Sequence, residues 1–191
     1  KKLVINGENR SSTIIDGNGT GDVILITSMY VDITRFTIRN SGDSIQVGNP
    51  DAGIFVDSYY INILDNDIIN NRYGIFIQNG RSHMLISNNS IMNNRGDGIL
   101  LNGGSQRATI SDNIIANNNQ EGTYARGGIW LLSSNNNIIA RNIISNNSGW
   151  GNIDMANGCY GNIITGNSIE RDVKGIYVYP SCHDNTFSYN W

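Results

Sequence analysis

Residues 87–102 read SNNSIMNNRGDGILLN, and the pattern within this stretch returns along most of the chain. Asn89 follows the apolar residue Ile86 by three positions. The same spacing joins an apolar residue to each of Asn66, Asn113, Asn142, Asn167 and Asn190. Successive Asn residues of this set are 23, 24, 29, 25 and 23 positions apart. A nearly fixed period in this range predicts a solenoid, in which each repeat packs against its two neighbours.

The residue types within each repeat favour β-strands. No window places apolar residues at helical spacing for three turns, and Asn and Gly are poor helix formers. Short Ile-rich runs bounded by Asn and Gly are typical of strands and turns. Three strands and three turns in about 23 residues make one coil of a parallel β-helix, whose coils lie roughly 4.8 Å apart. We predict an all-β, single-stranded parallel β-helix of about seven coils with a ladder of stacked Asn side chains.

Length and composition indicate one domain and exclude several classes of function. The 191 residues fit a single domain, residues 1–191, with residues 1–22 as a cap or first partial coil. Because the sequence ends within a repeat, at Trp191, we expect further domains or coils in the natural chain. Charged residues are 15% of the chain and the net charge is -3, which argues against a nucleic-acid-binding surface. No apolar run is long enough to insert into a membrane as a helix.

The two cysteines occupy equivalent places in the repeat. Cys159 and Cys182 are 23 residues apart, and each precedes an Asn by three positions. Equivalent positions on adjacent coils bring two Cα atoms to about 5 Å, which is within the range of a disulfide. We predict a disulfide, with a stacked pair of free thiols as the alternative. A disulfide would favour an extracellular or cell-surface location.

One strand of each coil carries an unusual outer face. Side chains alternate along this strand, so that Ile99 and Leu101 point inward and Leu100 points outward. The outward column is Phe55, Phe76, Leu100, Trp130, Asp154 and Tyr177, and a second column begins with Asp57, Gln78 and Asn102. We expect both columns to be exposed. Because exposed apolar side chains in a row are uncommon on a monomer, they indicate a ligand or a protein partner.

Two insertions break the period, both in the turn just before that strand. They are residues 41–52 and 118–127. The two loops are three coils apart on one edge, which is about 14 Å along the axis at the spacing of strands. With Phe76 and Leu100 between them they would wall a groove, and loops on rigid scaffolds often carry function.

The repeats resemble the right-handed parallel β-helix repeat of the pectin-lyase-like superfamily over essentially the whole chain. Residues 15–42, IDGNGTGDVILITSMYVDITRFTIRNSG, more narrowly resemble the opening of NosD-like and carbohydrate-binding and sugar-hydrolysis (CASH) domains of surface proteins, a neighbourhood that includes disaggregatase-like proteins of methanogenic archaea. The resemblance implies a right-handed helix with the Asn ladder between the second and third strands. It also implies a cleft along the first strand, walled by loops of the third turn, and a polysaccharide as the ligand.

Aromatic and polar side chains around this face are the candidates for substrate binding. Flat rings stack on the C–H faces of sugars, while amides, carboxylates and cations bond to the hydroxyl groups. The candidate residues are Phe55, Asp57, Phe76, Gln78, Asn102, Tyr124, Arg126, Trp130 and Asp154, with Tyr73, Trp150 and Tyr177 nearby. The alternative is that the aromatic stripe is a protein–protein interface, either of a homo-oligomer or with another domain.

Charged residues along the loop edge are the candidates for catalysis. Glycoside hydrolysis needs two carboxyl groups about 5–9.5 Å apart, and Asp97 and Glu121 precede adjacent strands. A β-elimination lyase would instead need a base and a neutralising cation, for which Arg72 and Arg95 are candidates. Solvated turn charges are the alternative for each of these residues.

No cofactor is predicted, because no metal-binding motif is recognisable, although the resemblance leaves calcium open. The two histidines, His83 and His183, fall on different coils far apart, and converging ligands are required for a soft metal. We predict an extracellular β-helix domain that cleaves a cell-envelope or matrix polysaccharide as a hydrolase or lyase. A non-catalytic carbohydrate-binding or structural surface module is the alternative.

Overall fold

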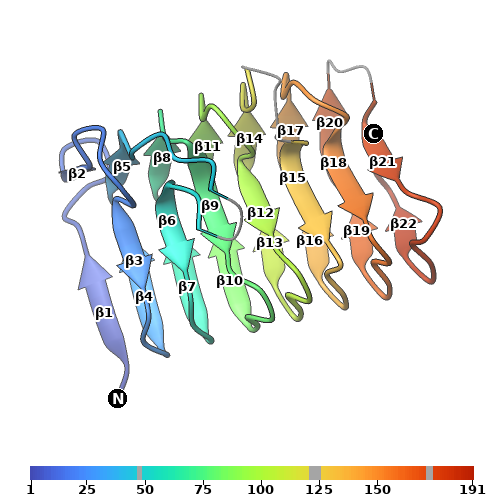
Figure 1. Cartoon of the computed structure of the whole chain (residues 1–191), viewed down its shortest axis with the longest axis horizontal. Helices are drawn as coiled ribbons and strands as arrows, with labels where there is room; N and C mark the ends of the chain where they lie inside the picture. Colours follow the sequence, from blue (N-terminus) through green and yellow to red (C-terminus); the bar gives the residue numbers. More distant parts are fainter. Residues whose placement is uncertain (47–48, 121–125, 171–173) are drawn as a thin grey trace.

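The computed structural model of the chain is an elongated stack of coils with the two termini at opposite ends (Figure 1). It describes residues 1–46, 49–120, 126–170 and 174–191. Three parallel sheets run along the stack and receive one strand from each coil, with eight strands in one sheet and seven in each of the others. The repeat of Asn residues therefore predicted the parallel β-helix correctly.

Each sheet is named here by the order in which the chain enters it, and every strand pairs only with its equivalents in the neighbouring coils. Sheet A contains β1 (Leu3–Asn6), β4 (Val31–Thr34), β7 (Ile61–Leu64), β10 (Met84–Ser87), β13 (Thr109–Ser111), β16 (Ile138–Ala140), β19 (Ile163–Thr165) and β22 (Thr186–Ser188). Sheet B contains β2 (Ile14–Asp16), β5 (Thr37–Arg39), β8 (Asp67–Ile69), β11 (Ser90–Met92), β14 (Ile114–Ala116), β17 (Ile143–Ser145) and β20 (Ser168–Glu170). Sheet C contains β3 (Ile24–Ile26), β6 (Ala52–Val56), β9 (Tyr73–Ile77), β12 (Ile99–Leu101), β15 (Gly127–Leu132), β18 (Gly151–Ala156) and β21 (Ile176–Val178).

The core is a set of stacked aliphatic columns between the three sheets. In sheet C the paired residues Ile54, Ile75, Ile99, Ile129 and Ile153 are fully buried, as the alternation of that strand predicts. Burying one Ile side chain contributes about 1.5–3 kcal/mol, so the columns supply most of the force that holds the coils together. No helix in the described part of the chain is long and apolar enough to cross a membrane.

The predicted Asn ladder lies in the turn between sheets A and B. Asn113 Nδ2 donates to the carbonyl oxygen of Ile86 and to Oδ1 of Asn142, both at 2.9 Å. Its own Oδ1 accepts from the backbone and side-chain nitrogens of Asn89. Phe36 occupies the equivalent place in an earlier coil, where its N–H donates to Asn66 Oδ1 at 3.0 Å. One buried amide per coil thus satisfies turn groups that no strand can reach.

Two further ladders occupy the other corners of the coil, and sequence analysis missed both. The ladder between sheets B and C is Asn71, Asn94, Asn118 and Asn147. The ladder between sheets C and A is Asn137, Asn162 and Asn185. Close approach of the backbone also explains the Gly that recurs before the strands of sheet C, since a Cβ at Gly98 would lie 2.7 Å from the carbonyl oxygen of Gly128.

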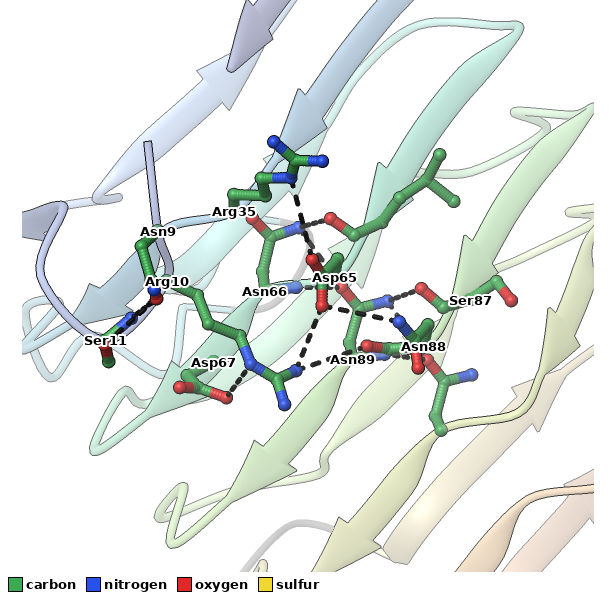
Figure 2. Close-up of polar contacts among 12 residues, drawn as sticks. Asn9, Arg10, Ser11, Arg35, Asp65, Asn66, Asp67, Ser87, Asn88 and Asn89 are labelled. Carbon is green, nitrogen blue, oxygen red and sulfur yellow. Dashed lines mark hydrogen bonds and ion pairs between the residues drawn. The ribbon is translucent and has the colours of Figure 1, made fainter. Parts of the chain in front are cut away.

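The segment between β1 and β2 folds over the turn that joins sheets A and B (Figure 2). Arg10 Nη1 lies 3.4 Å from Asp65 Oδ1, and Arg10 Nε lies 3.5 Å from Asp67 Oδ1. Arg10 also donates to the carbonyl oxygen of Asn88, which belongs to the next coil. Residues 1–22 supply β1 and β2, which pair with β4 and β5.

Cys159 and Cys182 are stacked on adjacent coils as their spacing predicts, but both thiols are free. The predicted disulfide is therefore wrong. Cys159 Sγ donates to the carbonyl oxygens of Leu131 and Ala156 at 3.3 and 3.2 Å, and burial raises the pKa of this thiol to about 11. A protonated thiol bonded to backbone carbonyls fills the core, so this pair no longer supports an extracellular location.

Candidate functional site

The outer face of sheet C is closed in its N-terminal part, from β6 to β12. The rings of Phe55 and Phe76 stack with centroids 4.9 Å apart, and Tyr73 packs edge-on against Phe76. Phe55 and Phe76 are each 2% exposed, and Leu100 is 4% exposed. The prediction that these three side chains are exposed is wrong, and the two rings are not available for stacking on a sugar.

The long connection between β5 and β6 is tied to the two following coils, whose sheet C strands carry Phe76 and Leu100. Its Asp43 lies 3.7 Å from Arg72 Nη1 and 2.8 Å from Arg95 Nη1, on the two following coils. The backbone N–H of Arg72 donates to Ser41 Oγ at 2.8 Å. Ser41 and Pro50 in the connection are themselves buried. Arg72 and Arg95, which the sequence suggests as catalytic cations, thus anchor this connection across the coils.

Two buried carboxyl groups lie beside this face, one near its middle strand and one toward its C-terminal end. Asp97 precedes β12, and Asp154 lies in β18 where it pairs with Trp130 of β15. Asp97 Oδ1 accepts the backbone N–H groups of Arg126 and Gly127 at 2.6 and 2.7 Å. Both carboxyl groups are 0% exposed. The predicted exposure of Asp154 is therefore also wrong.

Unpartnered buried polar atoms gather at this place. They are Asp97 Oδ2, both carboxyl oxygens of Asp154 and the indole Nε1 of Trp130. In the described part of the chain, these are four of the five buried side-chain atoms that lack a hydrogen-bond partner. Each such atom costs about 1–3 kcal/mol, so native structures contain few of them. Four in one cluster mark this place as a candidate functional site.

Burial moves the ionisation of both carboxyl groups toward neutral pH. The pKa of Asp97 is raised to about 7, chiefly by burial, while its two backbone donors oppose the rise. The pKa of Asp154 is raised to about 6 by burial, against the attraction of the cations Arg126 and Lys174. Groups with such pKa values can take up and release protons near neutral pH, as acid–base catalysis requires.

Five side chains lie near these carboxyl groups, and we call them the aromatic–cation cluster: Arg126, Trp150, Lys174, Tyr177 and Tyr179. The guanidinium of Arg126 lies 5.2 Å from the ring centroid of Trp150, and its Nη1 donates to the hydroxyl of Tyr179 at 2.7 Å. Lys174 Nζ lies 4.0 Å from the ring centroid of Tyr177. Trp150 and Lys174 are exposed, so the cluster offers cations and ring faces at the surface.

The structure brings together only some of the predicted site residues. Asp97, Arg126, Trp130 and Asp154 converge beside the outer face of sheet C. Asp57 instead pairs with Arg81, whose Nε donates to it at 2.8 Å, and Gln78 and Asn102 follow Asp57 in the second column, away from the carboxyl pair. Glu121 and Tyr124 lie outside the described residues, so the predicted pairing of Asp97 with Glu121 stays a prediction.

Lys174 is the site residue that sequence reasoning missed. The signal was present, because Lys174 directly precedes Gly175 at the start of a sheet C strand, at the edge where the insertions lie. Within residues 1–46, 49–120, 126–170 and 174–191, no group of three or more His, Cys, Asp or Glu side chains could hold a metal ion.

Comparison with known proteins identifies the family to which the chain belongs. A family model described as right-handed beta helix region matches residues 3–124 and 52–191, which together span nearly the whole chain. No curated protein matches the chain in sequence.

Several solved structures share the fold. The A-module of the Azotobacter vinelandii mannuronan C-5 epimerase AlgE6 superposes with a TM-score of 0.65 at 14% identity, covering 99% of this chain and 57% of that one. The enzymatically active domain of tailspike protein 2 of bacteriophage CBA120 gives 0.61 at 15% identity, covering 99% of this chain and 36% of that one. An alginate lyase from Paenibacillus sp. gives 0.54 at 13% identity, covering 98% and 90%. The chain thus spans little more than half of the first structure and about a third of the second, and at these identities the likeness concerns the fold alone.

Proposed function

The chain belongs to the right-handed beta helix family, and on that premise we propose that it binds an acidic polysaccharide and transforms it by proton transfer at Asp154. The observation that carries the proposal is the cluster of unpartnered buried polar atoms at Asp97, Trp130 and Asp154. Such a cluster costs stability, and acid–base chemistry at an elevated pKa is a reason to keep it.

The aromatic–cation cluster supports an acidic sugar as the ligand class. Arg126 and Lys174 supply two positive charges within a chain whose net charge is -3. The exposed ring of Trp150 offers an apolar face to the C–H side of a sugar ring. A uronate residue carries both features, because its carboxylate would bind the cations while its ring packs on the indole.

The chemistry follows from the charges around Asp154. Ionised above pH about 6, Asp154 can accept the proton on the carbon that bears the substrate carboxylate. Negative charge then develops on that carboxylate, where Arg126 and Lys174 would stabilise it. Expulsion of the neighbouring glycosidic oxygen, which takes up a proton from water as it leaves, is lyase chemistry. Delivery of a proton from water to the opposite face of the carbon is epimerisation. The names of the matched alginate lyase and mannuronan epimerase are consistent with both outcomes.

Asp97 has a different role in this proposal. Its Oδ1 holds the backbone N–H of Arg126 at 2.6 Å, so it positions the cation that would bind substrate. A hydrolase would require Asp97 or Glu121 as a second reacting carboxyl group. We propose a location at the cell surface or outside the cell, because that is where a matrix or envelope polysaccharide is found.

One observation favours a second candidate, a polysaccharide-binding module without turnover. Both Asp97 and Asp154 are 0% exposed, so a chain laid on this surface would meet Arg126, Lys174 and Trp150 before any carboxyl group. In that case the aromatic–cation cluster alone is the functional surface.

Turnover by wild type and Asp154→Asn separates the two candidates. A panel of acidic and neutral polysaccharides would be followed by ultraviolet absorbance of unsaturated products, by reducing ends and by proton NMR of sugar configuration. We expect turnover of an acidic polymer that falls at least about 100-fold in Asp154→Asn, the usual scale for a general base. Asp57→Asn, at a carboxylate paired with Arg81 on the same sheet, is the matched control and should keep full activity. Binding in affinity electrophoresis without turnover by wild type would establish the second candidate.

A further inference from the structure

A groove on another edge of the molecule has the features of a separate binding site. In the turn from sheet C to sheet A, the rings of Tyr30 and Tyr60 stack 5.0 Å apart, and Tyr60 stacks on His83 at 4.4 Å. Beside these rings lie the side chains of Asp32 and Asn62 from sheet A. Together with Lys2 these residues line a cavity of about 220 Å³, which we call the Tyr60 groove.

The backbone does not explain why aromatic residues stand there. Tyr30, Tyr60 and His83 have φ angles of 61°, 58° and 63°, in the left-handed region that bulky side chains rarely adopt. The same column in three later coils adopts the same conformation with Arg107, Asn136 and Gly161. Asn or Gly suits this conformation better, and strained residues cluster at ligand sites. Ring stacking offsets part of the cost.

The polar groups around the cavity are held in place by hydrogen bonds to one another and can still form further hydrogen bonds. Asp32 Oδ1 accepts from Asn62 Nδ2 at 2.7 Å, and Asp32 Oδ2 pairs with Lys2 Nζ at 2.6 Å. The side-chain oxygen Oδ1 of Asn62 and the hydroxyl groups of Tyr30 and Tyr60 have no hydrogen-bond partner within the described part of the chain. The cavity thus presents one acceptor, Asn62 Oδ1, together with two phenol hydroxyl groups and the remaining N–H groups of the Lys2 ammonium. All of them lie next to the edges of the aromatic rings.

These features select one class of ligand. We propose that the Tyr60 groove binds a single sugar residue. Sugar hydroxyls both donate and accept, so they can match the amide oxygen, the phenols and the ammonium together. A proline-rich peptide, the other ligand of aromatic-lined grooves, offers carbonyl acceptors and few donors, and would leave Asn62 Oδ1 unmatched. At about 220 Å³ the cavity is below the range of about 300–1,000 Å³ for drug-sized ligands, which limits it to one small ring.

This site is independent of the proton-transfer site proposed on sheet C. The groove belongs to the coils of β4, β7 and β10, whereas Asp154 and Lys174 belong to coils near the other end of the stack (Figure 1). A sugar held in the groove would add a second contact to a long saccharide, and linked contacts raise the overall affinity.

The test uses methyl glycosides of glucose, galactose, mannose, N-acetylglucosamine and glucuronic acid as probes. Each is titrated into ¹⁵N-labelled protein while the side-chain amide of Asn62 and the backbone amides of Tyr60 and His83 are observed by NMR. We expect at least one glycoside to give saturable shifts at these three places. Tyr60→Asn should raise its Kd at least about tenfold without loss of melting temperature, because Asn suits the left-handed conformation.

Tyr160→Asn is the matched control. The exposed ring of Tyr160 also stacks on a histidine, His183, with ring centroids 5.6 Å apart, but Tyr160 does not line the groove. This variant should leave the glycoside Kd unchanged. Asp154→Asn should also leave the glycoside Kd unchanged. The outcome of this test therefore does not depend on whether the protein turns over a polysaccharide at Asp154. The proposal is overturned if no glycoside shifts the three groups, if Tyr160→Asn weakens binding as much as Tyr60→Asn, or if Asp154→Asn alone abolishes it. Shifts from a proline-rich peptide with none from the glycosides would also overturn it.

Discussion

Asp97 shows at the scale of one residue how burial links stability to pH. Its pKa of about 7 in the folded chain lies above the ordinary value of 3.8, so the folded state holds a proton that the unfolded state releases. Stability from this group is fully present below pH about 4 and is lost as the pH rises through about 7. A side chain that weakens the fold in its charged form is consistent with a role in positioning or chemistry.

Asp97→Asn should remove this dependence, because the amide oxygen can still accept the N–H groups of Arg126 and Gly127 but does not ionise. We expect wild type to lose about 2–4 kcal/mol relative to the variant between pH 4 and pH 8, at 1.36 kcal/mol per pKa unit. Urea unfolding at several pH values measures it. Asp112→Asn is a control of opposite sign, because Arg141 lowers the pKa of Asp112 and that stability is lost as the pH falls. Parallel stability curves for wild type and Asp97→Asn would contradict the prediction.

The ladder makes a second prediction for single residues. Asn113→Leu removes the acceptor of both Asn89 donors and the donor to the Ile86 carbonyl in a fully buried turn. We expect it to lower the free energy of unfolding by about 1–3 kcal/mol. Asn190→Leu, at the half-buried end of the same ladder, should cost much less, since water can replace the lost bonds. Equal melting shifts in the two variants would mean that the ladder does not act as a buried column.

At the scale of elements, repetition made the fold predictable and covering segments made the site harder to predict. The period of Asn113 and its equivalents predicted the strand register, because each strand pairs only with its equivalents in the neighbouring coils. Alternation gave the direction of Phe55 and Phe76 correctly, yet direction relative to a sheet does not say what lies above it. The sequence revealed the connection before β6 but not that Asp43 would hold it to Arg72 and Arg95.

Asp43→Ala tests the anchoring of that connection. Surface ion pairs contribute about 0–1 kcal/mol, so the melting temperature should change little. We expect instead that the apolar cluster of Phe55 and Phe76 becomes accessible, seen as increased binding of a hydrophobic dye. Asp112→Ala breaks an exposed pair with Arg141 that covers no apolar cluster, and it should leave dye binding unchanged. Unchanged dye binding in Asp43→Ala would show that other contacts keep the face closed.

At the scale of the whole molecule, the net charge and the positions of the lysines decide where an acidic ligand can bind. The net charge of -3 would repel an acidic polysaccharide, so attraction must come from a local concentration of cations. Lysine occurs at Lys1, Lys2 and Lys174, which places ammonium groups at both ends of the stack. Of these three, only Lys174 acts, together with Arg126, on the buried carboxyl group of Asp154.

Lys174→Met should therefore weaken binding of an acidic polysaccharide severalfold at low ionic strength, by removing one cation from the aromatic–cation cluster. The difference from wild type should shrink at about 1 M salt, where the Debye length is about 3 Å and exposed charges no longer attract at a distance. Lys1→Met removes the same charge near the other end of the molecule, outside the lining of the Tyr60 groove, and should leave this binding unchanged. Affinity electrophoresis in gels containing the polymer, run at two salt concentrations, measures all three proteins. If Lys174→Met weakens binding equally at both salt concentrations, then Lys174 acts through its contact with Tyr177 and not through its charge. If both lysine variants weaken binding alike, the polymer is attracted by overall charge and the cluster is not its site.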